Sequence, residues 1–131
     1  MFAVEDIFTE KDRAEGLHVK YAHQEARFNA NLATSKYLKE WKERTGGNRF
    51  GEPAYCGFAW VTLYGVKLST KVGKEFKKIG FRRAWDGDGL QLWNPGDYGG
   101  QSLDLQEAGA KAYAQVLQNY GFEAYASSRA D

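Results

Sequence analysis

The stretch "AYCGFAWVTLYG" (residues 54–65) decides how the rest of the chain can fold. Large side chains alternate with small ones along it, with the period of two residues that is typical of a β-strand. One side of the strand would carry Cys56, Phe58, Trp60, Thr62 and Tyr64, and the other Tyr55, Gly57, Ala59, Val61 and Leu63. A strand with one solvated face alternates apolar and polar residues, whereas this one is apolar on both faces. The sequence therefore raises the question of what covers, or binds to, the second face.

The segment after this strand predicts a short helix and a hairpin. Ser69 or Thr70 can cap a helix that ends at Gly80, with Val72, Phe76 and Ile79 on its buried side. The stretches "FRRAW" and "LQLW" follow as two short strands. They are joined by "DGDG" (residues 86–89), whose Asp-Gly pairs favour the positive φ angles of a hairpin turn.

The last part of the chain predicts a loop, a helix and a final strand. After the loop "NPGDYGGQS", Asp104 and Glu107 have the spacing of a capping box at the start of an amphipathic helix. Gly121 would end this helix, and "FEAYASS" would be the last strand. The order β-α-β-β-α-β is that of the split βαβ, ferredoxin-like fold.

In that fold, two helices cover one face of a four-stranded antiparallel sheet whose first and third strands are central. We expect the small stripe Ala108, Gly109 and Ala112 to allow the last helix to approach the small residues of the first strand closely. Phe58, Trp60 and Tyr64 would then point to the opposite face. The sequence thus predicts an α+β fold with a βαββαβ core at residues 54–131.

Residues 1–50 predict a helical extension within the same single domain. Residues 14–45 contain no proline and one glycine, and a break near residues 33–35 would divide them into two helices. An apolar stripe recurs at three- and four-residue spacing and consists of Leu17, Tyr21, Gln24, Phe28, Leu32 and Ser35. We expect these helices to cover the aromatic face of the sheet. The alternative is an open platform on which nucleic-acid bases stack, as in RRM domains, although "GLQLW" lacks the RRM signature.

The composition fits a folded domain in a reducing compartment. Of 131 residues, 43% are hydrophobic and 15% aromatic, which is too apolar for a disordered chain. The single cysteine cannot form an internal disulfide. No stretch approaches the roughly 20 apolar residues of a membrane helix, and the first residues lack the pattern of a secretory signal. We therefore expect a cytoplasmic protein with no membrane partner.

Positive charge is concentrated in one segment, although the formal net charge is only +1. Residues 67–83 contain seven cationic side chains and one acidic side chain, Glu75. Such a helix face is commonly only solvated, but an excess of one sign favours a negatively charged partner, either nucleic acid or an acidic protein surface. The predicted partner-binding residues are Lys67, Lys71, Lys74, Lys77, Lys78, Arg82 and Arg83.

Signals for catalysis or metal binding are weak. A catalytic Cys56 would need a nearby base, and the only histidines, His18 and His23, lie in the N-terminal helical segment. One cysteine, two histidines and scattered acids make no recognisable metal-ligand set. The "DGDG" turn lacks the other acidic positions of a calcium loop. We therefore expect a binding protein rather than an enzyme, with no metal ion and no cofactor.

Three stretches carry a resemblance to other proteins: "CGFAW" (residues 56–60), "LWNPGDYGGQS" (residues 92–102) and residues 107–131, which end in "SRAD". Together they resemble an uncharacterised family of small proteins encoded by tailed bacteriophages. The resemblance implies a viral origin and a role in the cytosol of an infected cell, with no known catalytic residues. The matching positions are Cys56, Gly57, Phe58, Ala59, Trp60, Gln101, Ser102, Ala112, Gly121, Ser128 and Arg129.

Three functions remain open on this evidence. The first is a non-enzymatic phage accessory protein that binds nucleic acid, or a nucleic-acid-processing complex, through residues 67–83. The second is an inhibitor of a host defence system, of the anti-CRISPR type, that acts by contact with a host protein complex. The third is a cysteine-dependent or ligand-sequestering protein. Its ligand site would combine Cys56, Trp60, Gln101, Ser102 and Arg129. In this fold the expected start of the first strand at Cys56 and the end of the last strand at Arg129 would be neighbours.

Overall fold

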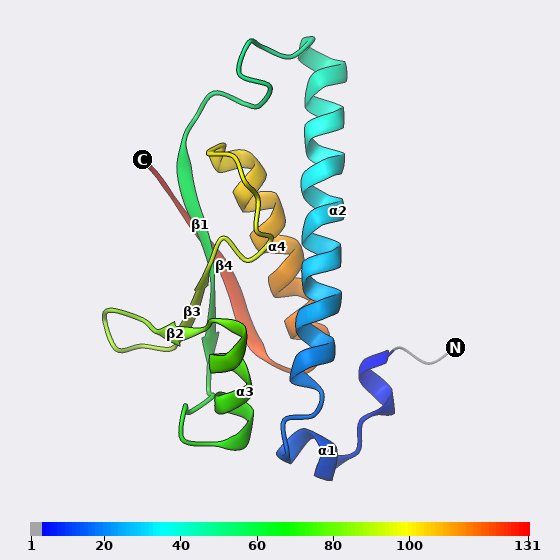
Figure 1. The fold of residues 1–131 in the computed structure, drawn as a ribbon, viewed down its shortest axis with the longest axis vertical. Helices are drawn as coiled ribbons and strands as arrows, with labels where there is room; N and C mark the ends of the chain where they lie inside the picture. Colours follow the sequence, from blue (N-terminus) through cyan, green and yellow to red (C-terminus); the bar gives the residue numbers. More distant parts are fainter. Residues whose placement is uncertain (1–3) are drawn as a thin grey trace.

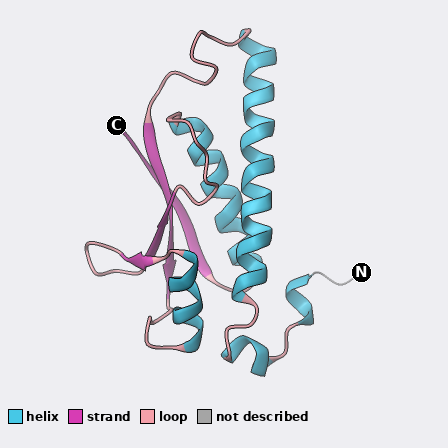
Figure 2. Ribbon diagram, viewed as in Figure 1, coloured by secondary structure: helices cyan, strands magenta, loops and turns pink. Residues whose placement is uncertain are grey.

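The computed structural model describes the backbone of residues 4–131 and the side chains from residue 6 onward. Residues 1–3 of the predicted helical extension lie outside the described part. The elements, coloured along the chain in Figure 1 and by type in Figure 2, form a sheet with helices stacked beside it. In chain order they are η1 (Val4–Ile7), α1 (Glu10–Ala14), α2 (Val19–Thr45), β1 (Gly57–Tyr64), α3 (Lys71–Ile79), β2 (Arg82–Arg83), β3 (Leu90–Trp93), α4 (Leu103–Asn119) and β4 (Glu123–Ala130).

The predicted four-stranded antiparallel sheet is confirmed. Its strand order is β2-β3-β1-β4, so β1 and β3 are the two central strands and β2 and β4 form the edges. On β1, Gly57, Ala59, Val61 and Leu63 are buried, as the alternating pattern predicts. Three of these four side chains belong to the hydrophobic core together with residues of α4. β1 therefore presents its small side chains to the helices.

The helices α3 and α4 begin differently, because only α3 has a side-chain cap. Thr70, one of the two predicted capping residues, caps α3. Its side chain accepts a hydrogen bond from the Gly73 N–H at 3.0 Å. α4 begins with Ser102 at the N-cap, so the predicted capping box at Asp104 is wrong. Its Gly109 faces α2 rather than the sheet, because a Cβ at that position would lie 3.2 Å from Thr34 Oγ1. α4 thus lies between the sheet and α2.

The long helix α2 differs from the prediction in two respects. It is continuous over 27 residues, so the predicted break near residues 33–35 is wrong. Between the buried Val19 and Trp41, its buried side carries the small residues Ala22, Ala26, Ala30 and Thr34, which recur every four residues and let α2 approach α4 closely. The large apolar residues of the predicted stripe are instead 52–63% exposed: Leu17, Tyr21, Phe28 and Leu32.

The second face of the sheet is not covered by any described element. α2 packs on α4, and α4 packs on β1 and β4, so these helices all lie on one side of the sheet (Figure 1). The prediction that the N-terminal helices cover the aromatic face is therefore wrong. The physical reason is the match of small side chains between α2 and α4, which holds α2 on the helix side. Phe58, Trp93 and Tyr125 remain 39%, 46% and 51% exposed on the open side.

Candidate binding surface on the open side of the sheet

The open side of the sheet carries side chains from four strands in cross-strand rows. Alternate residues of a strand face the same side of the sheet, so the pairing register identifies every residue on the open side. Phe58 lies opposite Arg129, and Trp60 lies between Trp93 and Ser127. We call this surface the aromatic face; its residues are Phe58, Trp60, Thr62, Tyr64, Arg82, Gln91, Trp93, Glu123, Tyr125, Ser127 and Arg129.

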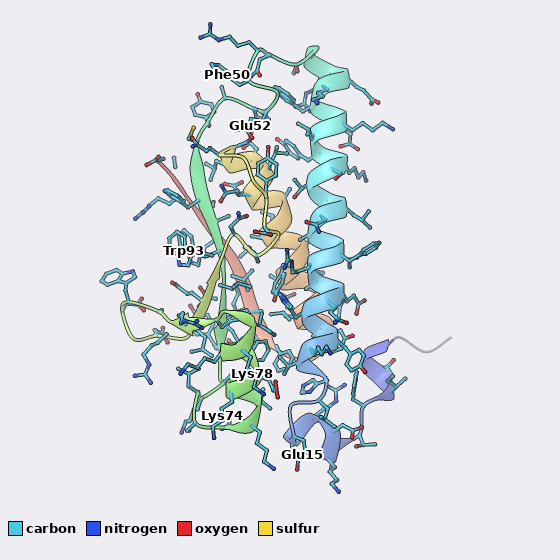
Figure 3. The ribbon with its side chains drawn as sticks, in the orientation of Figure 1. Glu15, Phe50, Glu52, Lys74, Lys78 and Trp93 are labelled. Atoms are coloured by element: carbon cyan, nitrogen blue, oxygen red, sulfur yellow. The ribbon has the colours of Figure 1, made fainter. Side chains whose placement is uncertain are left out.

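The aromatic rings on this face form two groups. Trp60 and Trp93 stack with their centroids 4.6 Å apart, and Phe58 meets Trp93 edge-on at 6.0 Å. Tyr64 and Tyr125 form the second group, with centroids 6.2 Å apart. In Figure 3, Trp93 lies beside the sheet on the side away from the long helices. Half-exposed, mutually supported rings of this kind are typical of a surface that binds a partner.

A pocket of about 320 Å³ opens at the Phe58 end of the aromatic face. It forms where β3 leaves β1. The Asn94 N–H donates to the Ala59 carbonyl at 2.8 Å, and pairing along this side of β1 resumes only where the Gly57 N–H donates to the Gln101 carbonyl at 3.1 Å. Between these two bonds, the buried Gln106 side chain of α4 accepts from the Ala59 N–H at 3.2 Å. This glutamine supplies the acceptor that the Ala59 N–H would otherwise find in a neighbouring strand.

The loop that forms the rim of the pocket is held by side-chain hydrogen bonds. Asn94 has a positive φ of 46°, ends β3, and binds both backbone groups of Tyr98. The Tyr98 hydroxyl donates to the Glu52 carboxylate, which also accepts from the Gln101 N–H at 3.1 Å. Burial and the adjacent Glu52 raise the pKa of Tyr98, so the phenol keeps the proton that it donates. Figure 3 shows Glu52 at this end of the molecule, away from α3.

The structure brings together most of the predicted ligand-site residues. Cys56 and Gln101 both line the pocket, and the Cys56 thiol donates to Gln101 Oε1 at 3.6 Å. Ser102 forms a β-bridge with Cys56, but its side chain is buried. The Arg129 guanidinium lies 6.0 Å from the Phe58 ring centroid, beside the pocket. Trp60 is one row away, on the aromatic face rather than in the pocket lining.

Sequence reasoning missed three side chains that line the pocket: Asn94, Gln106 and Asp131. Gln106 is the most informative of them, because its amide replaces a missing strand in hydrogen bonding to β1. No local sequence signal marks such a role, which depends on where β3 leaves the sheet. Asp131 comes to the pocket because its N–H continues the β4 pairing to the Cys56 carbonyl at 3.0 Å.

The two histidines lie away from Cys56, so the thiol gains no base from them. The His23 ring contacts the Tyr113 hydroxyl at 2.6 Å between α2 and α4, and His18 stacks on Phe122 at 5.0 Å. Burial lowers the pKa of both histidines. No group of three or more His, Cys, Asp or Glu side chains in the described part of the chain is placed to hold a metal ion. Neither histidine is therefore placed to act on the Cys56 thiol.

The predicted basic residues are all exposed, but most lie apart from the aromatic face. α3 lies on the helix side of the sheet, where Figure 3 labels its Lys74 and Lys78. Lys71 pairs with Glu15 at 2.9 Å and Lys78 with Glu75 at 3.2 Å. Within the described residues, no carboxylate lies within ion-pair distance of the other five predicted cations: Lys67, Lys74, Lys77, Arg82 and Arg83.

Arg82 is the predicted basic residue whose register position lies on the aromatic face, opposite Gln91. Its guanidinium donates to the carbonyl oxygens of Lys77 and Phe81 at the end of α3, at 3.0 and 2.9 Å. Lys67 and Arg83 line a separate groove of about 410 Å³ beside the β2–β3 hairpin. The seven predicted cations therefore do not form one continuous surface with the aromatic rings.

Comparison with known proteins finds no matching family model, no similar curated protein and no similar solved structure. The resemblance to small bacteriophage proteins therefore stays a prediction. In the part of the chain that the structure describes, no helix combines the length and apolar character needed to span a bilayer.

Proposed function

We propose that this chain is a non-enzymatic protein that binds single-stranded nucleic acid on the aromatic face. The observation that carries the proposal is the uncovered sheet surface with five aromatic rings from β1, β3 and β4. A base stacked on an aromatic side chain contributes about 1–3 kcal/mol, with little dependence on the identity of the base. The two groups of rings give separate places for bases, and the pocket beside Phe58 can receive another.

The layout of the sheet supports this proposal by analogy. We interpret the element order β1-α3-β2-β3-α4-β4, with strand order β2-β3-β1-β4, as the ferredoxin-like fold. RRM domains use a four-stranded sheet and stack two or three bases on its aromatic side chains. In the present chain, Trp60 and Trp93 occupy adjacent positions on the two central strands. The analogy concerns the sheet face, because the RRM sequence signature is absent.

The charges on this face predict how binding should depend on salt. Arg129 is placed to hold a phosphate beside Phe58, and Arg82 marks the opposite border. Each phosphate contact on a single strand contributes about −0.7 to the slope of log affinity against log salt. Two contacts give a slope of about −1.4. Binding through the unpaired lysines of α3 would instead be steeply salt-dependent and would include duplex DNA.

The biological setting of the proposal comes from the resemblance to small bacteriophage proteins. We keep the phage accessory role and the cytoplasm of the infected cell as parts of the proposal. Single-stranded DNA or RNA, free or within a nucleic-acid-processing complex, is the partner class that the aromatic face fits best. The basic segment at residues 67–83 then has a secondary role, at most adding attraction over a distance.

Fluorescence anisotropy of a labelled polythymidine strand tests this proposal. We expect the strand to bind, a duplex of equal length to bind more weakly, and the salt slope to be shallow. Charge reversal by Lys74→Glu and Lys77→Glu should change the affinity little, whereas Phe58→Ala should weaken it clearly. Absence of binding at low salt, or loss of binding only on charge reversal in α3, would overturn the proposal.

A second candidate function is supported by the exposed apolar stripe of α2. Tyr21, Phe28 and Leu32 are more than half exposed and lie on the side of α2 away from its small residues. The similarly exposed Leu17 lies just before the helix begins at Val19. An amphipathic helix with such a stripe can lie in a groove of another protein. This arrangement suits the inhibitor of a host defence complex. Phe28→Ser with Leu32→Ser would then abolish co-purification of the target, and an unchanged yield of the target would exclude this use of the stripe.

A further inference from the structure

We propose that two copies of this chain pair through the free edges of their β4 strands and join their sheets. In the described part of the chain, β4 (Glu123–Ala130) pairs with β1 on one side and has no strand on the other. A free edge of this length presents unpaired N–H and C=O groups, which is a template for pairing. The opposite edge, β2, has only two residues, so β4 is the edge that can support a long pairing.

The hydrogen bonds to β1 determine which backbone groups of β4 remain free. The Asp131 N–H donates to the Cys56 carbonyl at 3.0 Å, in the same register that pairs Gly57 with Ala130. Each residue of an antiparallel strand directs its N–H and its C=O to the same neighbouring strand, and successive residues alternate between the two neighbours. The odd-numbered residues therefore bond to β1, and Ala124, Ala126, Ser128 and Ala130 direct theirs to the free edge. One of these groups, the Ala124 carbonyl, also accepts from the Gln118 side chain of α4 at 2.7 Å. A regular antiparallel partner must pair even-numbered residues with even-numbered ones.

Charge then selects one of the allowed registers. If Ala126 lies on the twofold axis, each Glu123 lies opposite Arg129 of the second copy, and this ion pair occurs twice. These odd-numbered positions are non-hydrogen-bonded pairs, in which the Cα atoms are closest and side chains interact most strongly. The sequence of the edge is thus complementary to itself in this register.

The two neighbouring registers are less favourable. An axis at Ser127 would place Glu123 opposite Asp131 of the second copy, which is repulsive. An axis at Tyr125 would leave both Glu123 and Arg129 without an opposite charge. The Ala126 register is therefore the one that combines a regular ladder with attractive charge pairs.

The side chains on the helix side of β4 are small at the positions that direct their backbone groups to the free edge. The edge-directed residues are three alanines and Ser128, whose hydroxyl donates to Glu107 of α4 at 2.7 Å. A shallow groove beside Ala126 is lined by Glu107 and Lys111, which carry opposite charges. Two copies related by the twofold axis would present both signs to each other there. On the other side, the two aromatic faces would become one surface across a joined sheet.

Sedimentation equilibrium over a range of protein concentrations, without nucleic acid, tests the pairing. We expect a dimer for the wild type. For the single variants Glu123→Arg and Arg129→Glu, the dissociation constant of the dimer should rise by at least about tenfold, because each variant places like charges opposite each other twice. The double variant Glu123→Arg/Arg129→Glu restores the pairs and should recover the dimer. A matched surface change on α2, Glu43→Arg, should leave the dimer unchanged.

Ala126→Pro gives an independent test, because the Ala126 N–H points away from β1 and its loss removes no bond within one copy. The variant should keep the circular dichroism of the wild type and sediment as a monomer. A monomeric wild type at every concentration, or a double charge variant that stays as weak as the single ones, would overturn the proposal. Because nucleic acid is absent, these results do not depend on the function proposed above.

Discussion

Replacing Trp93 by alanine should strongly weaken the binding of single-stranded nucleic acid. Trp93 is 46% exposed and stacks on Trp60 at 4.6 Å, so its free ring face is one of the largest stacking surfaces on the aromatic face. Loss of one stacked base corresponds to about 1–3 kcal/mol. This range converts to an affinity lower by roughly 5- to 150-fold. The half-exposed position of Trp93 makes us expect that the variant still folds.

The chain supplies a matched control for this experiment. Trp85 is 92% exposed in the β2–β3 hairpin, outside the rows of the aromatic face, so Trp85→Ala makes the same chemical change elsewhere. Anisotropy titration of the labelled strand should give an affinity within about twofold of the wild type for Trp85→Ala. Equal affinities for the Trp93→Ala variant and the wild type would refute stacking on this face. So would an equal loss in both tryptophan variants, because it would show that position on the face is irrelevant.

Three further predictions concern stability and the support of the site. The free energy of unfolding should fall as the pH drops below about 6.5. Burial lowers the pKa of His18 and His23, so below this pH the unfolded chain binds protons that the folded chain does not. A urea unfolding midpoint that stays constant as the pH falls through this range would contradict this prediction. Gly73→Ala should lower the midpoint temperature of thermal unfolding, because the new Cβ would overlap the Lys67 carbonyl. This clash should outweigh the intrinsic helix preference of alanine over glycine, which is about 1 kcal/mol. A raised midpoint would show instead that α3 can shift to make room. Gln106→Leu should destabilise the fold by about 1–3 kcal/mol in urea titration, because the Ala59 N–H loses its acceptor; an unchanged midpoint would show that this bond is dispensable.

The sheet could be predicted from the sequence because its signals are local. Alternation of side-chain size marks both faces of β1, and Thr70 and Gly80 bound α3 as predicted. The buried side of α2 could not be predicted in the same way. Its most hydrophobic stripe is exposed, whereas Ala22, Ala26 and Ala30 are buried because small side chains permit a close approach to α4. Hydrophobicity within a helix does not identify its partner.

The candidate site was predictable only where it follows from strand ends. Cys56 and Gln101, two of the five predicted ligand-site residues, both line the pocket, and the ligand site itself stays a prediction. The role of Gln106 depends on where β3 leaves β1, which is a long-range property of the fold. The exposure of the aromatic face likewise depends on α2 packing against α4 and not against the sheet. This single packing choice moves the expected binding surface from the basic helix to the aromatic rings.

The most direct test of the central claim is to map the backbone and indole N–H resonances of isotope-labelled protein as a short single strand of DNA is added. The proposal predicts shifts of the Trp60 and Trp93 indole signals and of amides in β1, β3 and β4. The signals of α3 and of the buried Trp41 should change little. Shifts confined to the lysines of α3 or to the apolar stripe of α2, or no shifts at a high excess of the strand, would contradict it.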